Sequence, residues 1–88
     1  MYETPKVLEV KALKNYYIYI KFISGEEKVY DMKEHIEDIE FYNKLKERKY
    51  FENVRPRGHS VEWENGEDVS PENLYYNSIP FEKFIDED

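Results

Sequence analysis

The sequence has no cysteine, only two histidines, only three glycines and no long run of apolar residues. The lack of cysteine excludes disulfides, thiolate zinc sites, iron–sulfur clusters and a cysteine nucleophile. Three glycines are too few for a phosphate-binding loop. A membrane span needs about 20 consecutive apolar residues, and residues 1–10 contain no apolar signal core. We therefore expect a cytoplasmic protein without a membrane anchor or a cofactor.

The chain is short, acidic and rich in aromatic residues. Its 88 residues are enough for one domain, which leaves little room for a walled active-site cleft. Twenty acidic and 13 basic side chains give a net charge of −7, which repels phosphate backbones and makes nucleic acid an unfavoured partner. Nine tyrosines, five phenylalanines and one tryptophan are too many for a disordered chain.

Residues 16–23 alternate between the two faces of a strand, and 27–31 form a second run beyond the turn at 24–25. The pattern predicts a β-hairpin. Its register stays open, because a two-residue loop would place Lys21 opposite Lys28.

Two further strand patterns lie outside this hairpin. Residues 7–12 alternate loosely, and Asn15 marks a tight connection, so we expect a three-stranded antiparallel meander. Residues 51–55 and 60–64 predict a second hairpin with its loop at 57–59.

Two short helices are expected between the meander and the second hairpin. Residues 31–34 fit a capping box, and apolar residues then follow at helical spacing. The step from Ile39 to Phe41 is only two residues, so these side chains do not share one helical stripe. We therefore predict helices at 32–38 and 40–49 with a kink between them.

The C-terminal part begins with a helix signal and ends in acidic residues. Ser70 can cap a helix in which Pro71 takes the first position. Pro80 should end this helix, and residues 1–80 are expected to form one domain. Residues 81–88 are expected to be an acidic, frayed tail.

Two tyrosines have two possible roles each, and the tryptophan has one. Tyr17 and Tyr19 lie on the second face of the longest strand, which either the two short helices cover or a partner covers. The first alternative is the commoner one. Trp63 is expected in the core, with residues 65–68 accepting a hydrogen bond from its indole N–H.

Basic side chains gather in the basic island, which we define as residues 44–57. The island could contact an acidic partner or a stretch of nucleic acid, since arginine and aromatic groups together hold phosphates and stack bases. The commoner interpretation is a solvated helix face. The candidate partner contacts of the chain are Tyr17, Tyr19, Arg48, Arg55, Arg57 and His59.

Catalysis has little support in the sequence. His35 and His59 are far apart and lack metal-ligand spacing. His59 and Ser60 are adjacent, so on a strand they point to opposite faces and do not form a nucleophile and base pair. We expect neither catalytic nor metal-binding residues.

The order of distinctive residues resembles the bacterial domain-of-unknown-function family 2442. The most specific part is the motif W-x-N-G-x-D-x-S-P-x-x-L-Y from Trp63 to Tyr75, and the likeness covers about Pro5 to Tyr76. Members often have proline where this chain has Glu64. Earlier matching residues are Asn15, Tyr16, Phe22, Gly25, Glu26, Val29, Asp31, Phe41, Leu45, Phe51, Val54 and Val61.

The resemblance implies an α+β domain with an antiparallel sheet and short helices. Similar bacterial proteins are often encoded beside a second short family, in a pair that looks like a toxin–antitoxin module. We therefore predict a small single α+β domain that acts as a non-enzymatic, antitoxin-like interaction module and masks a basic partner protein encoded by the adjacent gene. The alternative function is nucleic-acid binding or regulation through the basic island. A homodimer through Tyr17 and Tyr19 is a further expectation.

Overall fold

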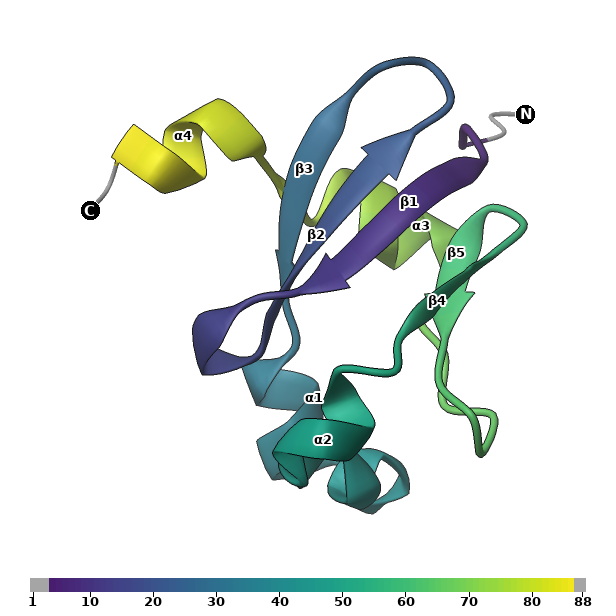
Figure 1. Ribbon diagram of the computed structural model, residues 1–88, viewed down its shortest axis with the longest axis vertical. Helices are drawn as coiled ribbons and strands as arrows, with labels where there is room; N and C mark the ends of the chain where they lie inside the picture. The colour runs from purple at the N-terminus through teal and green to yellow at the C-terminus, as the bar shows by residue number, and fades with distance from the viewer. Residues whose placement is uncertain (1–3, 87–88) are drawn as a thin grey trace.

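The computed structural model describes residues 4–86 and has an α+β architecture, as predicted. A sheet lies at its centre, with helical segments at one end and a second hairpin beside it (Figure 1). In chain order, the elements are β1 (Val7–Ala12), η1 (Lys14–Tyr16), β2 (Tyr17–Phe22), β3 (Glu27–Asp31), α1 (Lys33–Asp38), η2 (Glu40–Lys46), α2 (Arg48–Phe51), β4 (Arg55–Arg57), β5 (Ser60–Glu62), α3 (Pro71–Tyr76), β6 (Ile79–Pro80) and α4 (Phe81–Asp86).

The main sheet has the strand order β1-β2-β3-β6 and is antiparallel throughout. Strands β1 to β3 form the expected meander, whereas β6 was not expected, because two residues that include a proline carry no strand pattern. Tyr19 pairs with Val29 and Lys21 with Glu27, so the two lysines are not opposite each other. Gly25 has φ of 95°, the left-handed conformation that closes the hairpin loop.

The core lies on the inner face of the sheet. Ile18, Ile20 and Phe22 of β2 point into it and are fully buried. Leu45 of η2 and Leu74 of α3 reach the same cluster from other parts of the chain. Each of these side chains contributes about 1.5–3 kcal/mol on burial, so this face accounts for most of the apolar stabilisation.

The second hairpin forms from shorter strands than expected, because residues 48–51 are helical rather than extended. As part of α2, Tyr50 and Phe51 both reach the core. Trp63 is fully buried, as expected, but its indole N–H donates to the Phe51 carbonyl at 2.9 Å and not to the turn at 65–68. Phe51 is the last residue of α2, and the carbonyls at a helix end have no partner within the helix.

The β1–β2 connection holds two consecutive residues in the left-handed region, Asn15 with φ of 59° and Tyr16 with φ of 61°. Tyrosine rarely adopts this backbone. Two contacts hold it there: the Tyr16 hydroxyl donates to the Lys46 carbonyl at 2.7 Å, and its ring meets Phe51 edge-on at 5.0 Å. The strained residue therefore ties the sheet to the helical segments.

The kink between the first helices falls at Ile39, as predicted. The capping box at 31–34 does not form. Instead, the Asp31 carboxylate accepts from the Lys33 N–H at 2.8 Å, one residue earlier than the box requires. By contrast, the Ser70 cap is present, because its hydroxyl accepts from the Asn73 N–H at 3.2 Å.

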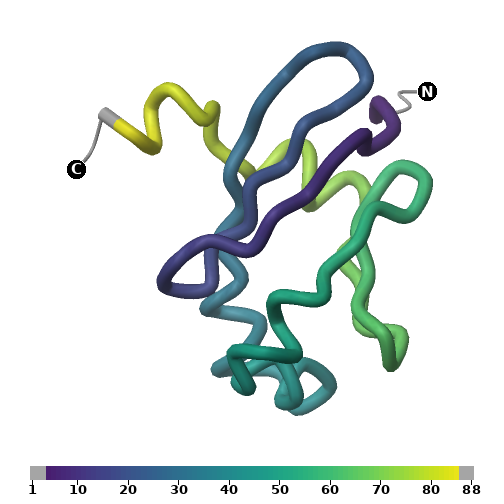
Figure 2. The backbone as a smooth tube through the Cα atoms, in the orientation of Figure 1, coloured from purple at the N-terminus to yellow at the C-terminus, as the bar shows by residue number. Residues whose placement is uncertain are grey.

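The expected frayed tail is helical over most of its length. Residues 81–86 form α4, which follows β6 directly, contacts β3 and β6, and projects past β3 at the upper left of Figure 2. Phe81 and Phe84 give this acidic segment an apolar side, which the count of charges did not indicate. Residues 87–88 lie outside the described part of the chain.

Candidate functional site

The outer face of the sheet carries Tyr17 and Tyr19, together with Val29 of β3 and Ile79 of β6. The two short helices do not cover this face, contrary to the commoner expectation. It is α4 that covers it: Phe81 meets the Tyr19 ring at 5.1 Å and Phe84 meets the Tyr17 ring at 5.0 Å, both edge-on. The two candidate tyrosines are thus brought together on one surface, beneath a helix of six residues.

Both tyrosines also have polar contacts. The Tyr19 hydroxyl donates to the Glu27 carboxylate, and this hydrogen bond, together with desolvation, raises the pKa of Tyr19 to about 12. The Lys33 ammonium lies 3.8 Å from the centre of the Tyr17 ring. Lys33 also bonds the Asp31 carboxylate at 3.3 Å, so each ring is fixed by its neighbours.

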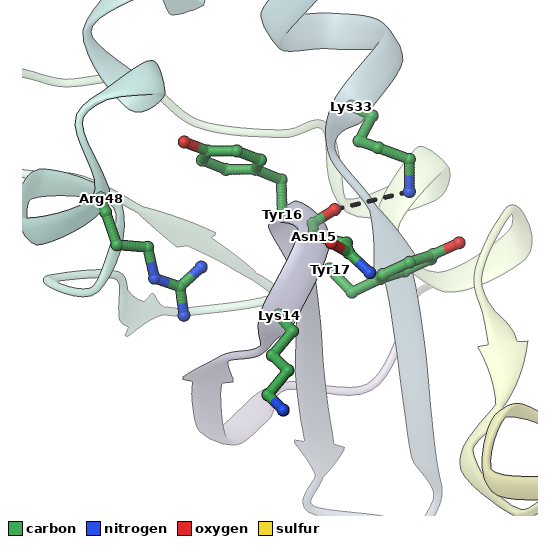
Figure 3. Close-up of a pocket in the computed structure, with 6 residues that line it drawn as sticks. All are labelled: Lys14, Asn15, Tyr16, Tyr17, Lys33 and Arg48. Carbon is green, nitrogen blue, oxygen red and sulfur yellow. Dashed lines mark hydrogen bonds between the residues drawn. The ribbon is translucent and has the colours of Figure 1, made fainter. Parts of the chain in front are cut away.

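An open cavity of about 620 Å³ lies beside Tyr17 (Figure 3). Its lining residues are Lys14, Asn15, Tyr16, Tyr17, Lys33 and Arg48.

The three cations of this cavity do not converge on one point, as Figure 3 shows. Arg48 donates to the Leu13 carbonyl at 2.8 Å and pairs with Glu52 at 3.0 Å. Lys33 points towards the Asn15 carbonyl at 3.4 Å. Two of the three charges therefore stabilise the loop and the helices around them, and the cavity lacks the arrangement of an anion site.

The basic island does not form one patch. Arg55 and Arg57 share the Glu62 carboxylate at 2.9 and 3.0 Å, while Arg48 is paired on α2. Lys44 likewise pairs with Glu47 at 3.2 Å. Since carboxylates neutralise these side chains locally, the structure adds no support to the nucleic-acid alternative.

The two histidines take part in separate contacts. His59 lies in the β4–β5 loop, where its Nδ1–H donates to the Thr4 carbonyl. The Nε2 atom of His35 lies 2.7 Å from the Tyr30 hydroxyl, and the two rings stack. Among residues 4–86, no group of three or more His, Cys, Asp or Glu side chains could hold a metal ion.

A second surface lies at the junction of α1 and η2, and sequence reasoning missed it as a candidate site. Ile39 and Phe41 are 43% and 58% exposed, although both are large apolar residues. Phe41 contacts the Tyr42 ring at 5.1 Å, and the Tyr42 hydroxyl donates to the Asp68 carbonyl at 2.6 Å. Phe41 therefore rests on a fixed aromatic ring. The two-residue step between Ile39 and Phe41 was the signal that could have revealed it.

Four carboxylates lie beside these two side chains in the sequence. In the part of the chain that the structure describes, none of the four has an ion-pair partner. These four residues, Ile39 and Phe41 are all exposed within residues 34–41, and we call the six residues the acidic–apolar patch. Its residues are Glu34, Glu37, Asp38, Ile39, Glu40 and Phe41.

Comparison with family models gives one match. The model described as "Protein of unknown function (DUF2442)" covers residues 7–80. The chain belongs to the DUF2442 family. This confirms the family resemblance, and the DUF2442 match includes both the acidic–apolar patch and the outer-face tyrosines, whereas α4 begins just beyond it. No curated protein and no solved structure matches the chain. Within residues 4–86, every helix is too short or too polar to cross a membrane.

Proposed function

We propose that this protein is a non-enzymatic interaction module that binds a basic partner protein through the acidic–apolar patch. The observation that carries the proposal is the exposure of Ile39 and Phe41 among four carboxylates that, within residues 4–86, have no ion-pair partner. Exposed apolar side chains with a polar rim are typical of protein interfaces. Charge and apolar exposure at this surface therefore both favour a protein partner.

The two kinds of side chain have different roles in this proposal. Burial of Ile39 and Phe41 supplies affinity, since an apolar side chain transferred from water gains about 1.5–3 kcal/mol. The carboxylates select a basic surface and speed its approach, an effect that the net charge of −7 strengthens. The partner that fits is a basic protein with an apolar recess.

The resemblance described in the sequence analysis implies a more specific form of the proposal. The chain acts in the bacterial cytoplasm in an antitoxin-like manner and masks a basic protein encoded by the adjacent gene. In this form, the patch covers the functional surface of the partner, as charge complementarity allows.

Co-expression with the product of the adjacent gene tests the proposal. The expected result is one complex that elutes as a single peak in size-exclusion chromatography and contains both chains. Two independent peaks at micromolar concentration would count against an antitoxin-like role.

Single substitutions test the surface itself. Phe41→Asp should weaken binding by at least about 100-fold, because it removes an anchor and introduces a charge that must be desolvated. Ile23→Asp is the matched control, since Ile23 is 60% exposed, close to the 58% of Phe41, and lies in the β2–β3 loop. Equal binding by both variants would place the interface elsewhere. Isothermal titration calorimetry supplies the affinities.

A further inference from the structure

Helix α4 is attached to the domain by few contacts. Phe81 and Phe84 each make one ring contact with the sheet. For residues 81–85, no side-chain hydrogen bond or ion pair to another element is present. Ile85 is 54% exposed, so the apolar side of the helix is only partly used. Two edge-on ring contacts therefore join α4 to the outer face of the sheet.

A helix of this length does not form alone. Isolated helices shorter than about 12–15 residues are marginal in water, because nucleation fixes several residues before hydrogen bonds compensate. The six residues of α4 are consequently helical only while they are docked. Helix formation and docking against Tyr17 and Tyr19 therefore occur in one equilibrium. Helices that form only on docking are among the least stable parts of a fold.

The face beneath α4 requires a cover. Val29 is only 2% exposed, and it lies on this face beside Tyr19 rather than in the main core. Removal of α4 would expose the rings of Tyr17 and Tyr19 as well. An uncovered apolar sheet face is a binding surface, so the loss of one cover favours the arrival of another.

Helix α4 does not fill the face completely. A cavity of about 290 Å³ remains next to Phe81, over the outer side of β1 and β2. Its lining combines the apolar surface of Leu13, Tyr19 and Phe81 with the polar side chains of Glu9, Lys11 and Glu27. A larger or longer segment than α4 would therefore find additional room on the same face.

We infer that the outer face of the sheet is a peptide-binding groove that α4 occupies within its own chain and that a partner's short helical segment can occupy instead. The segment that fits has two aromatic residues three positions apart, because Phe81 and Phe84 fill the groove with this spacing. One helical turn places residues i and i+3 on the same face. The groove shares no residue with the acidic–apolar patch, so either proposal can fail alone.

The test uses the full chain with α4 detached. In the F81A/F84A variant both ring contacts are lost, and a labelled peptide with the sequence of residues 80–88 should bind, with NMR shift changes at Tyr17, Tyr19 and Val29. The peptide should bind the unchanged chain at least about tenfold more weakly, because the linked helix competes at an effective concentration in the millimolar range. A peptide with alanine at both aromatic positions should not bind.

Matched controls show whether the peptide binds at this groove and through its aromatic residues. Ile85→Ala changes an exposed residue of α4 that has no ring contact, so it should leave peptide binding as weak as in the unchanged chain. Peptide binding to F81A/F84A without shift changes at the three groove residues, or no binding at all, would overturn the proposal. Exchange of α4 between two copies would appear as a concentration-dependent dimer that the peptide dissociates, and this outcome also supports the groove.

A second measurement applies if F81A/F84A does not fold. Amide hydrogen exchange in the unchanged chain should be at least about 100-fold faster for residues 82–86 than for β2, because α4 opens without global unfolding. Equal protection of the two segments would show that α4 is an integral part of the fold and would overturn the proposal.

Discussion

The two faces of strand β2 differ in which elements pack on them. Several elements pack on the inner face, whereas one short helix packs on the outer face. On its inner face, Ile18, Ile20 and Phe22 are fully buried by elements that follow over the next fifty residues. On its outer face, the rings of Tyr17 and Tyr19 meet the two phenylalanines of one short helix, and Lys33 and Glu27 add polar contacts. The same six-residue strand therefore contributes to a permanent core on one side and to an exchangeable contact on the other.

The difference lies in how each cover is held. The inner cover is tied by backbone and side-chain hydrogen bonds, for example from Trp63 to Phe51 and from Tyr16 to Lys46, in addition to packing. The outer cover relies on ring contacts that can be broken one at a time. The inner face of the sheet thus provides stability and the outer face provides recognition. Substitutions on the two faces should therefore affect different properties.

Trp63→Ala should have the largest effect, because it empties the centre of the inner core. Removing a fully buried tryptophan costs about 3–5 kcal/mol, and the Phe51 carbonyl loses its donor. Since small domains have a free energy of unfolding of about 5–15 kcal/mol, the variant should unfold at much lower urea concentration. Trp63→Phe should lower the free energy of unfolding by less than Trp63→Ala does. Equal urea midpoints for Trp63→Ala and the unchanged chain would contradict the assignment of Trp63 to the core.

Phe84→Ala should have a smaller effect on the opposite face. The loss of a half-buried ring and its contact with Tyr17 should lower the free energy of unfolding by about 1–2 kcal/mol. A double-mutant cycle with Tyr17→Ala should give a coupling energy of about 0.5–1.5 kcal/mol. Additive losses in urea unfolding would show that the two rings do not interact in solution.

Ser70→Ala tests how far the inner cover depends on α3. The substitution removes the acceptor of the Asn73 N–H and should cost about 1 kcal/mol. Ser24→Ala serves as the control in a loop, where the hydroxyl bonds only the exposed Glu26 carboxylate. A loss in thermal unfolding that is no larger than in the control would show that the Ser70 cap does not stabilise α3.

High pH should act on the outer face through Tyr19. Its pKa is about 12 in the folded chain and 10.0 ordinarily, so the folded state holds the proton more tightly. The resulting stability is complete below pH 10 and is lost as the pH rises towards 12. Glu27→Gln removes the charged acceptor and should lower the pKa of Tyr19, as an NMR titration of the ring would report. An unchanged pKa would exclude the hydrogen bond as its cause.

Sequence patterns were sufficient where one local rule decides the structure. The alternation of residues 16–23 between two faces predicted β2, and the Ser70–Pro71 pair predicted the start of α3. The register of the β2–β3 hairpin was undetermined because loop length decides it, and the conformation of Gly25 is not visible in the pattern.

The candidate site could be predicted only in part. Tyr17 and Tyr19 were identified as a surface that needs a cover, yet charge counting concealed the aromatic spacing of Phe81 and Phe84. The arginines of the basic island were grouped by sequence, whereas the fold pairs Arg48 with Glu52 and both Arg55 and Arg57 with Glu62. Cross-strand pairing with Glu62 depends on a hairpin register that one sequence does not define.

Tyr16 imposes a narrow requirement on the amino acid that can occupy its position. The backbone there favours glycine or asparagine, whereas the hydroxyl bond to Lys46 and the ring contact with Phe51 can be made only by tyrosine. Glycine or asparagine would relax the backbone but lose both contacts, whereas most other residues would lose contacts without relaxing the backbone. Position 16 should therefore tolerate far fewer amino acids in a saturation library than its partial exposure suggests, and its variation among homologues should be correspondingly low.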